Sequence, residues 1–238
     1  MESEKKIESC IRCGTCCENG GPTLHSEDRI FLQKGVLMPT HLFTLRAGEL
    51  AYHPLEERLI ELSDEMIKIK GKDDGSGACI FYDAKQHGCA IYEDRPLECR
   101  ALKCWDTRDI EGLFMQDLLS RLDLCPKDSA ISGLISAYER SFPPGRIYGL
   151  LSKAGPREGA QQAGPEIEQM VSTDEAFRQK VIETLGPGED ELEFFFGRPV
   201  RSLIEGIRTL MNTNKKRPPI TPHKRPFLYP CTAKPVFL

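Results

Sequence analysis

The residues best suited to chemistry are cysteines, and four of them occupy the short stretch "CIRCGTCC" near the start of the chain. They are Cys10, Cys13, Cys16 and Cys17. A two-residue gap lets two thiolates turn toward one ion, so the run C-x2-C-x2-C can wrap three sulfurs around one site. Gly14 eases the turn within this run. The stretch therefore predicts a metal site built from thiolates.

Disulfides are the alternative use of so many cysteines, and the sequence disfavours them. Adjacent cysteines such as Cys16 and Cys17 rarely bond to each other, because the required geometry strains the peptide between them. The start of the chain, "MESEKKIESC", is charged and lacks the apolar core of a secretory signal. We therefore expect a cytoplasmic protein, and in a reducing compartment a cysteine cluster indicates metal ligands before disulfides.

The spacing also bears on which metal is bound. Bacterial-type iron–sulfur proteins use this local run and often take a further ligand from a remote Cys-Pro, which Cys125 and Pro126 supply here. Structural zinc sites more often use two separated C-x2-C pairs, and only the first such pair is present. The local spacing favours an iron–sulfur cluster of the 4Fe–4S type and leaves zinc open.

A second site is predicted from Cys17. Because neighbouring side chains diverge, we expect Cys17 to face away from the site that Cys16 serves. Cys17 would then join three cysteines further along the chain: Cys79, Cys89 and Cys99. Four basic residues close to these candidates in sequence could offset the charge of the thiolates or could simply be solvated: Arg12, Arg95, Arg100 and Lys103.

The elements that must position these cysteines form a small, loop-rich α+β domain over about residues 7–126, which metal cross-links would help to hold together. "HSEDRIFLQKG" predicts a short helix that Gly35 ends. "EMIKIKG" and "ACIFYD" predict strands, and "AKQHG" predicts a turn after the second. "RPLECRALKCW" predicts a helix with Pro96 in its first turn.

Residues 127–213 contain no cysteine and predict a helical region with a flexible linker near 155–165. Apolar stripes at helical spacing occur in "AISGLISAYER" and "RPVRSLIEGIRTLMN". Ser172 and Glu175 have the spacing of a capping box, and Gly186-Pro187 is a stop signal. We expect the stripes to be buried against each other or against the first region, with a partner-binding groove as the less favoured alternative.

Three segments resemble a known family: "CIRCGTCC", "GACIFYD" and "CAIYEDRPLECR". The family is the cysteine-cluster family called CxxCxxCC or YkgJ-like, whose domain is described as zinc- or iron-chelating. The last segment is the most specific, because C-x-I-Y-x-x-R-P-x-x-C-R joins two cysteines through a fixed tyrosine, arginine and proline. The resemblance covers about residues 7–126 and implies these ligands: Cys10, Cys13, Cys16, Cys17, Cys79, Cys89, Cys99 and Cys125. Cys104 is additional to the pattern and is kept as a further candidate.

The resemblance also extends, in this cysteine domain, to flagellin lysine methylases, which implies methyl transfer assisted by an iron–sulfur centre. The sequence adds no nucleotide loop to support that activity, since Asp73 and Asp74 in "GKDDGSG" would repel a phosphate. Our leading hypothesis is a cytoplasmic protein that chelates zinc or an iron–sulfur cluster. An iron–sulfur-dependent enzyme and a metal-stabilised interaction module are the alternatives.

Charge and hydropathy indicate which classes of partner the protein can bind. The formal net charge of −4 does not indicate a nucleic-acid binder, and no apolar run is long enough to cross a bilayer. Residues 214–238 hold six Lys or Arg, no acidic residue and many prolines, which predicts an arm outside the fold. A protein partner, if there is one, would use this basic tail or the helical region.

Overall fold

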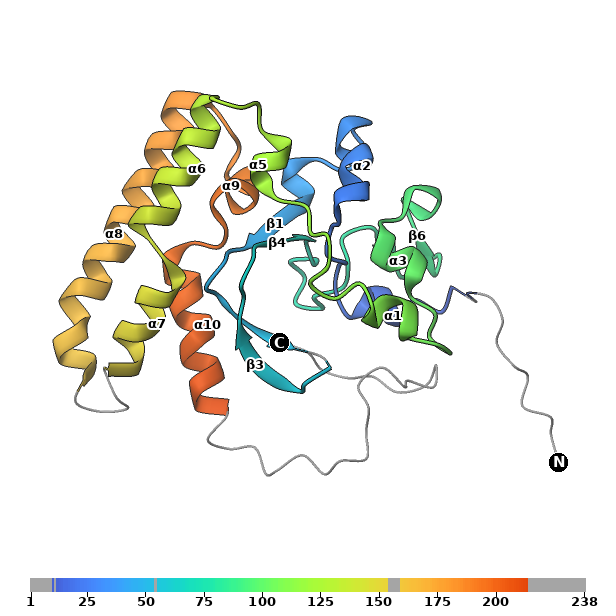
Figure 1. The fold of residues 1–238 in the computed structure, drawn as a ribbon, viewed down its shortest axis with the longest axis horizontal. Coiled ribbons are helices and arrows are strands. Elements are labelled where there is room, and N and C mark those ends of the chain that lie inside the picture. The colour runs from blue at the N-terminus through green and yellow to red at the C-terminus, as the bar shows by residue number, and fades with distance from the viewer. Residues whose placement is uncertain (1–9, 11, 54, 154–158, 214–238) are drawn as a thin grey trace. The chain divides into compact units, whose positions relative to one another are not determined.

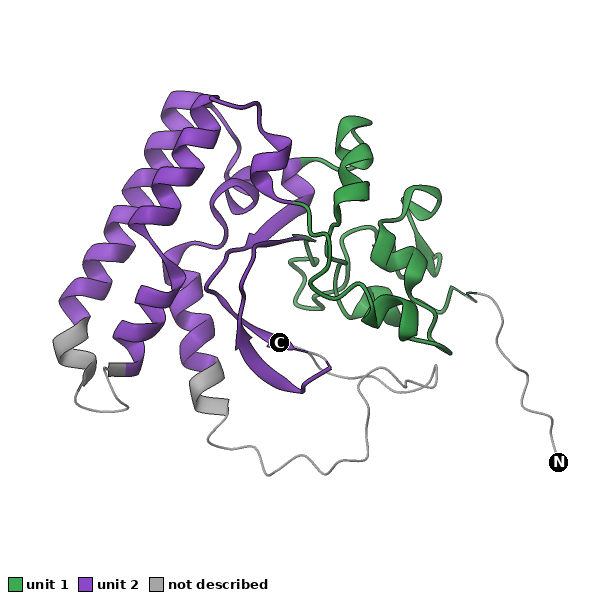
Figure 2. Cartoon of the chain, viewed as in Figure 1, with its two compact units in different colours: residues 1–38, 68–119, 221–238 green, residues 39–67, 120–220 purple. Residues whose placement is uncertain are grey.

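The structure is a computed structural model, and it describes residue 10 and residues 12–53, 55–153 and 159–213. The chain forms two compact units, shown in different colours in Figure 2. Within the described residues, unit 1 comprises 10–38 and 68–119, and unit 2 comprises 39–67 and 120–213. Both helices and strands are present, so the fold is α+β with a helical region, as predicted.

Unit 1 is built from short elements joined by loops (Figure 1). Its helices and helical turns are α1 (Thr15–Glu18), η1 (Ser26–Asp28), α2 (Arg29–Gln33), η3 (Tyr92–Asp94), α3 (Leu97–Ala101) and α4 (Arg108–Glu111). Strands β5 (Tyr82–Asp83) and β6 (Gly88–Cys89) pair antiparallel, with Tyr82 opposite Cys89. Leu24, Ile69 and Leu119 are almost fully buried and form much of its small core.

Unit 2 combines three longer strands with the helices (Figure 1). Its strands are β1 (Leu42–Leu45), β2 (Leu50–His53) and β3 (Arg58–Glu61), and β4 (Met66–Ile69) begins in unit 2 and continues into unit 1. β2 and β3 pair antiparallel with Leu50 opposite Glu61, and β1 pairs with β4. The helical elements are η2 (Pro39–His41), α5 (Arg121–Leu124), α6 (Ala130–Ser141), α7 (Pro144–Lys153), α8 (Gly159–Leu185), α9 (Glu189–Phe196) and α10 (Val200–Thr213).

The predicted apolar stripes are buried inside unit 2. Ile135 and Tyr138 of α6 and Leu203, Ile204 and Ile207 of α10 belong to one hydrophobic core. That core also takes Leu192 and Phe196 from α9, whose first turn carries Glu189, Asp190 and Glu191. The prediction that the stripes pack against each other is therefore confirmed.

The short-range predictions have mixed outcomes. Gly186 has φ +74 and follows the last residue of α8, so the stop signal is confirmed. The helix start predicted at Ser172 is wrong, because α8 begins at Gly159 and runs through both Ser172 and Glu175. Most of the segment 155–165 falls in α8 from Gly159 onward, while residues 154–158 lie outside the described residues. "ACIFYD" contributes only the two-residue strand β5.

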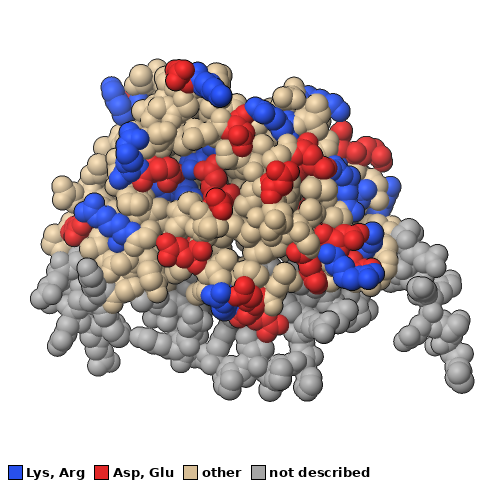
Figure 3. All heavy atoms as spheres, viewed as in Figure 1, with Lys and Arg blue, Asp and Glu red and all other residues tan. Residues whose placement is uncertain are grey.

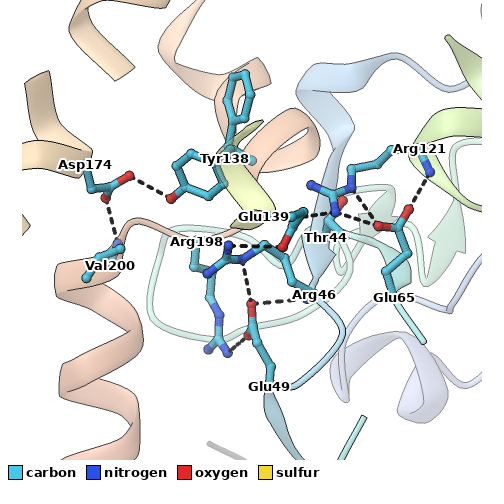
Figure 4. A network of polar contacts seen from close by, with 12 residues as sticks. Thr44, Arg46, Glu49, Glu65, Arg121, Tyr138, Glu139, Asp174, Arg198 and Val200 are labelled. Atoms are coloured by element: carbon cyan, nitrogen blue, oxygen red, sulfur yellow. Dashed lines mark hydrogen bonds and ion pairs between the residues drawn. The ribbon is translucent and has the colours of Figure 1, made fainter. Parts of the chain in front are cut away.

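Buried charges join the strand segment of unit 2 to its helices, as Figure 4 shows. Arg121 forms ion pairs with Glu65 at 2.5 Å and Glu139 at 2.7 Å, and its side chain is 2% exposed. Arg46, fully buried, lies 3.3 Å from the same Glu139. Thr44 Oγ1 donates to the Phe194 carbonyl at 2.7 Å. These contacts anchor residues 39–67 to α6 and α9, although the sequence places that segment between the cysteine motifs.

The described surface has mixed charge. Acidic and basic side chains are interspersed over the face drawn in Figure 3, in keeping with the small net charge of −4. Within the described ranges, no helix combines the length and the apolar character needed to cross a membrane.

Candidate metal centre

The vicinal cysteines lie at the start of unit 1, where the chain turns sharply. Gly14 has φ +82, a conformation that glycine adopts without the strain of a Cβ atom, and it precedes the one-turn helix α1. Gly14 is also packed against Tyr82, since a Cβ added at residue 14 would overlap the tyrosine hydroxyl. The predicted role of Gly14 in the turn is confirmed, and the structure adds a packing requirement that the sequence did not reveal.

The thiols of Cys16 and Cys17 face each other, with their Sγ atoms 3.9 Å apart. The expectation that they diverge is wrong, because both residues lie in α1, where successive side chains are about 100° apart and not on opposite faces as in a strand. Two sulfurs bound to one tetrahedral zinc at about 2.3 Å each would be about 3.8 Å apart. The observed separation therefore suits two ligands of one ion.

The remaining cysteines of unit 1 are held by different elements. The backbone N–H of Cys79 donates to the carbonyl of Cys17 at 2.7 Å, which ties the loop before β5 to α1. Cys89 lies in β6, opposite Tyr82. Cys99 lies in α3, which begins at Leu97, so the predicted helix is present but Pro96 is its N-cap residue and not part of its first turn. Cys79 is 7% exposed and the other two are half-buried.

The ionisation of these thiols is coupled through space. Burial raises the pKa of Cys79, Cys89 and Cys99, and the nearby thiol of Cys16 raises all three further. The hydrogen bond between the vicinal thiols raises the pKa of Cys17, as do burial and the neighbouring Cys16, Cys79 and Cys99. The same hydrogen bond lowers the pKa of Cys16 to about 7. Five thiols thus share one electrostatic environment, and a cation bound there would relieve the mutual repulsion of their thiolates.

Three of the four basic residues named in the sequence analysis lie close to the segments that carry these cysteines. Arg95 lowers the pKa of both Cys16 and Cys89 by its charge, and its Cζ lies 3.5 Å from the centroid of the Tyr92 ring. Arg12 Cζ lies 4.0 Å from the same centroid. Arg100 instead pairs with Glu27, and Lys103 pairs with Asp109 at 2.5 Å. Arg100 Nη1 also donates to the carbonyl of Arg95 at 2.5 Å, so of the four basic residues only Lys103 has its ion pair away from these segments.

Sequence reasoning missed the residues that hold α3 in place. Asp28 Oδ1 accepts from the backbone N–H of Leu97 at 2.8 Å, and its Oδ2 accepts from that of His25 at 2.9 Å. Glu98 Oε2 accepts from the backbone N–H of Thr23 at 2.7 Å. These contacts fix the helix that carries Cys99. Asp28 and Leu97 are 69 positions apart, so no local pattern could have revealed their contact.

The other predicted ligands are placed as follows. The backbone N–H of Arg12 donates to Cys10 Sγ at 3.4 Å, and Cys13 Sγ donates to Thr15 Oγ1 at 3.4 Å. Cys104 is half-buried in unit 1. Cys125 belongs to unit 2, where it packs against the helical core. Cys231 lies outside the described residues.

The donor set suits a thiophilic metal, because thiolates are preferred by zinc and by iron–sulfur clusters alike. Among the residues that the structure describes, no three Cys, His, Asp or Glu side chains already stand in an arrangement that would hold an ion. We expect metal binding by these cysteines to be coupled to local ordering of unit 1.

Gly14→Ala should destabilise unit 1 and weaken metal binding. The new Cβ meets Tyr82, which is 4% exposed and has little room to move, and alanine disfavours φ +82. We expect a loss of roughly 2 kcal/mol or more of unfolding free energy, of which the left-handed backbone accounts for about 1 kcal/mol. The matched control is Gly75→Ala, which has φ +80 but no atom within 4 Å of the added Cβ. Equal losses in chemical denaturation of the two variants would contradict the packing role of Tyr82.

Comparison with known proteins agrees with this geometry. Residues 9–118 match the family named CxxCxxCC, which is described as a putative zinc- or iron-chelating domain. No curated protein and no solved structure matches the chain. The match includes the eight cysteines from Cys10 to Cys104 and ends before Cys125. Over residues 9–118, the chain therefore resembles the CxxCxxCC family, as its three short segments predicted.

Proposed function

We propose that this protein acts in the cytoplasm and chelates zinc or an iron–sulfur cluster through its N-terminal cysteines. The observation that carries the proposal is the 3.9 Å separation of the Cys16 and Cys17 sulfurs. Cys79, Cys89 and Cys99 share the electrostatic environment of this pair. We assign the vicinal pair to one centre, whose other ligands come from these three cysteines.

The remaining cysteines are proposed as follows. Cys10, Cys13 and Cys125 are proposed as further ligands, in keeping with the Cys-Pro that follows the local run. Cys104, the thiol outside the eight that the family resemblance implies, is not required. The local C-x2-C-x2-C spacing supports a 4Fe–4S cluster over zinc.

Anaerobic purification of the full-length chain, followed by metal analysis and an absorption spectrum, tests the proposal. A brown protein with iron and acid-labile sulfide would establish the cluster, whereas a colourless protein with stoichiometric zinc would establish a zinc site. The test must be anaerobic, because exposed thiolates such as Cys16 oxidise readily. A preparation that holds neither metal, and takes up neither zinc nor iron with sulfide after reduction, would refute the proposed function.

A further inference from the structure

Two guanidinium groups lie over the ring of Tyr92 in unit 1. The Cζ atom of Arg95 is 3.5 Å from the ring centroid, and that of Arg12 is 4.0 Å from it. A guanidinium over an aromatic face is attracted by the ring's electrons. Arg12 lies between Cys10 and Cys13, whereas Arg95 lies between Cys89 and Cys99. Tyr92 therefore connects the first cysteine segment of unit 1 to the last.

The backbone of Arg12 explains why this contact matters. Arg12 has φ +56, a left-handed conformation that a residue with a Cβ atom adopts only at a cost in free energy. In this conformation its N–H points to Cys10 Sγ at 3.4 Å. Hydrogen bonds from backbone N–H groups to sulfur orient and tune thiolate ligands. The side chain of Arg12 is exposed, and the contact of its guanidinium with the Tyr92 ring holds it in place.

On the other side of the contact, Arg95 is fixed to the turn that carries the ring. Its Nε donates to the carbonyl of Tyr92 at 2.6 Å. Pro96 follows directly and precedes α3, the helix with Cys99. The charge of Arg95 also favours the thiolates of Cys16 and Cys89. The ring of Tyr92 is thus held against the Arg95 guanidinium, which lies near the cysteines of unit 1.

We propose that Tyr92 is a positioning residue for metal chelation, which holds Arg12 in its left-handed conformation and so presents Cys10 and Cys13 beside the other cysteines of unit 1. This inference rests on the proposed function. Tyr92 contacts no metal in this role and acts only through the two arginines. Removal of the ring should leave unit 1 folded, since Tyr92 is half-buried and lies outside its core.

Co²⁺ is a suitable probe, because its bonds to thiolates give charge-transfer absorption whose intensity rises with the number of sulfur ligands. We would titrate the reduced, metal-free, full-length chain with Co²⁺ and measure release to a chelator. Tyr92→Leu should lower the charge-transfer intensity per Co²⁺ and speed release roughly five- to thirty-fold. Tyr92→Phe keeps the aromatic face and should restore most of both. Tyr148→Leu, at a 39%-exposed tyrosine of α7 in unit 2, is the matched control.

Variants of Arg12 give a second readout that does not depend on Tyr92. Arg12→Gly loses the guanidinium but retains easy access to positive φ, whereas Arg12→Ala loses both. We expect Arg12→Ala to weaken Co²⁺ binding more than Arg12→Gly does. Unchanged intensity and release in Tyr92→Leu, or equal losses in Tyr92→Leu and Tyr92→Phe, would overturn the inference while the proposed function stands. Absence of Co²⁺ binding to the unaltered chain would instead count against the proposed function itself.

Discussion

Cys17→Ser should lower the affinity of the full-length chain for its metal by about a hundredfold or more. Structural zinc sites bind with roughly 10–16 kcal/mol shared among four ligands, so the loss of one thiolate removes a few kcal/mol.

Cys104→Ser is the matched control for this prediction. Cys104 and Cys17 are both half-buried cysteines of unit 1, so the two substitutions change the same atoms in similar surroundings. Metal content and the rate of metal loss to a chelator should differ sharply between the variants, with Cys104→Ser close to the unaltered protein. Similar losses in both would mean that Cys104 is a ligand and that our choice of cysteines is wrong.

Cys125→Ser tests whether the cysteine of unit 2 binds metal in addition to the cysteines of unit 1. If Cys125 is a metal ligand, its removal should lower the total metal per chain and leave the metal held by the vicinal pair in place, because the loss of one thiolate weakens only the site that used it. Full metal content and unchanged amide exchange in Cys125→Ser would remove Cys125 from the ligand set.

Arg121→Met should destabilise unit 2 by roughly 3 kcal/mol, because it leaves Glu65 without the cation that holds it and leaves Glu139 with Arg46 alone. The Arg121 side chain is 2% exposed, and it pairs with Glu65, which is 18% exposed, and Glu139, which is 31% exposed. Breaking a buried ion pair by removing one partner costs about 3–5 kcal/mol, and the partial exposure of the carboxylates places this case at the lower end. Methionine retains the apolar stem, so little packing is lost.

Urea denaturation of the full-length chain, followed by the helical circular dichroism signal, measures this loss. The control is Arg201→Met, which breaks an exposed ion pair with Glu175 and should change the unfolding midpoint little. If the two units unfold in separate transitions, only the transition of unit 2 should shift in Arg121→Met. The metal content of the chain should stay the same. An Arg121→Met midpoint indistinguishable from that of Arg201→Met would show that the buried network contributes no net stability.

Local patterns in the sequence predicted the elements and chemistry that depend on neighbouring residues. Conformational preference or helical periodicity accounts for four of them: the turn at Gly14, the start of α3 near Pro96, the end of α8 before Gly186 and the buried stripes of α6 and α10. The family resemblance likewise rests on short motifs, and the comparison confirmed it over residues 9–118. Each of these features involves residues within a few positions of one another.

The tertiary structure decided what depends on residues far apart in the chain. It turned the thiols of Cys16 and Cys17 toward each other, where the sequence predicted divergence. It joined Asp28 to the start of α3 and placed both Arg12 and Arg95 over Tyr92. It also assigned residues 39–67, which lie between the cysteine motifs, to the helical unit through Arg46, Glu65 and Thr44. Such contacts depend on packing and on the pairing of buried charges across the fold, and neither leaves a periodic signal in the sequence.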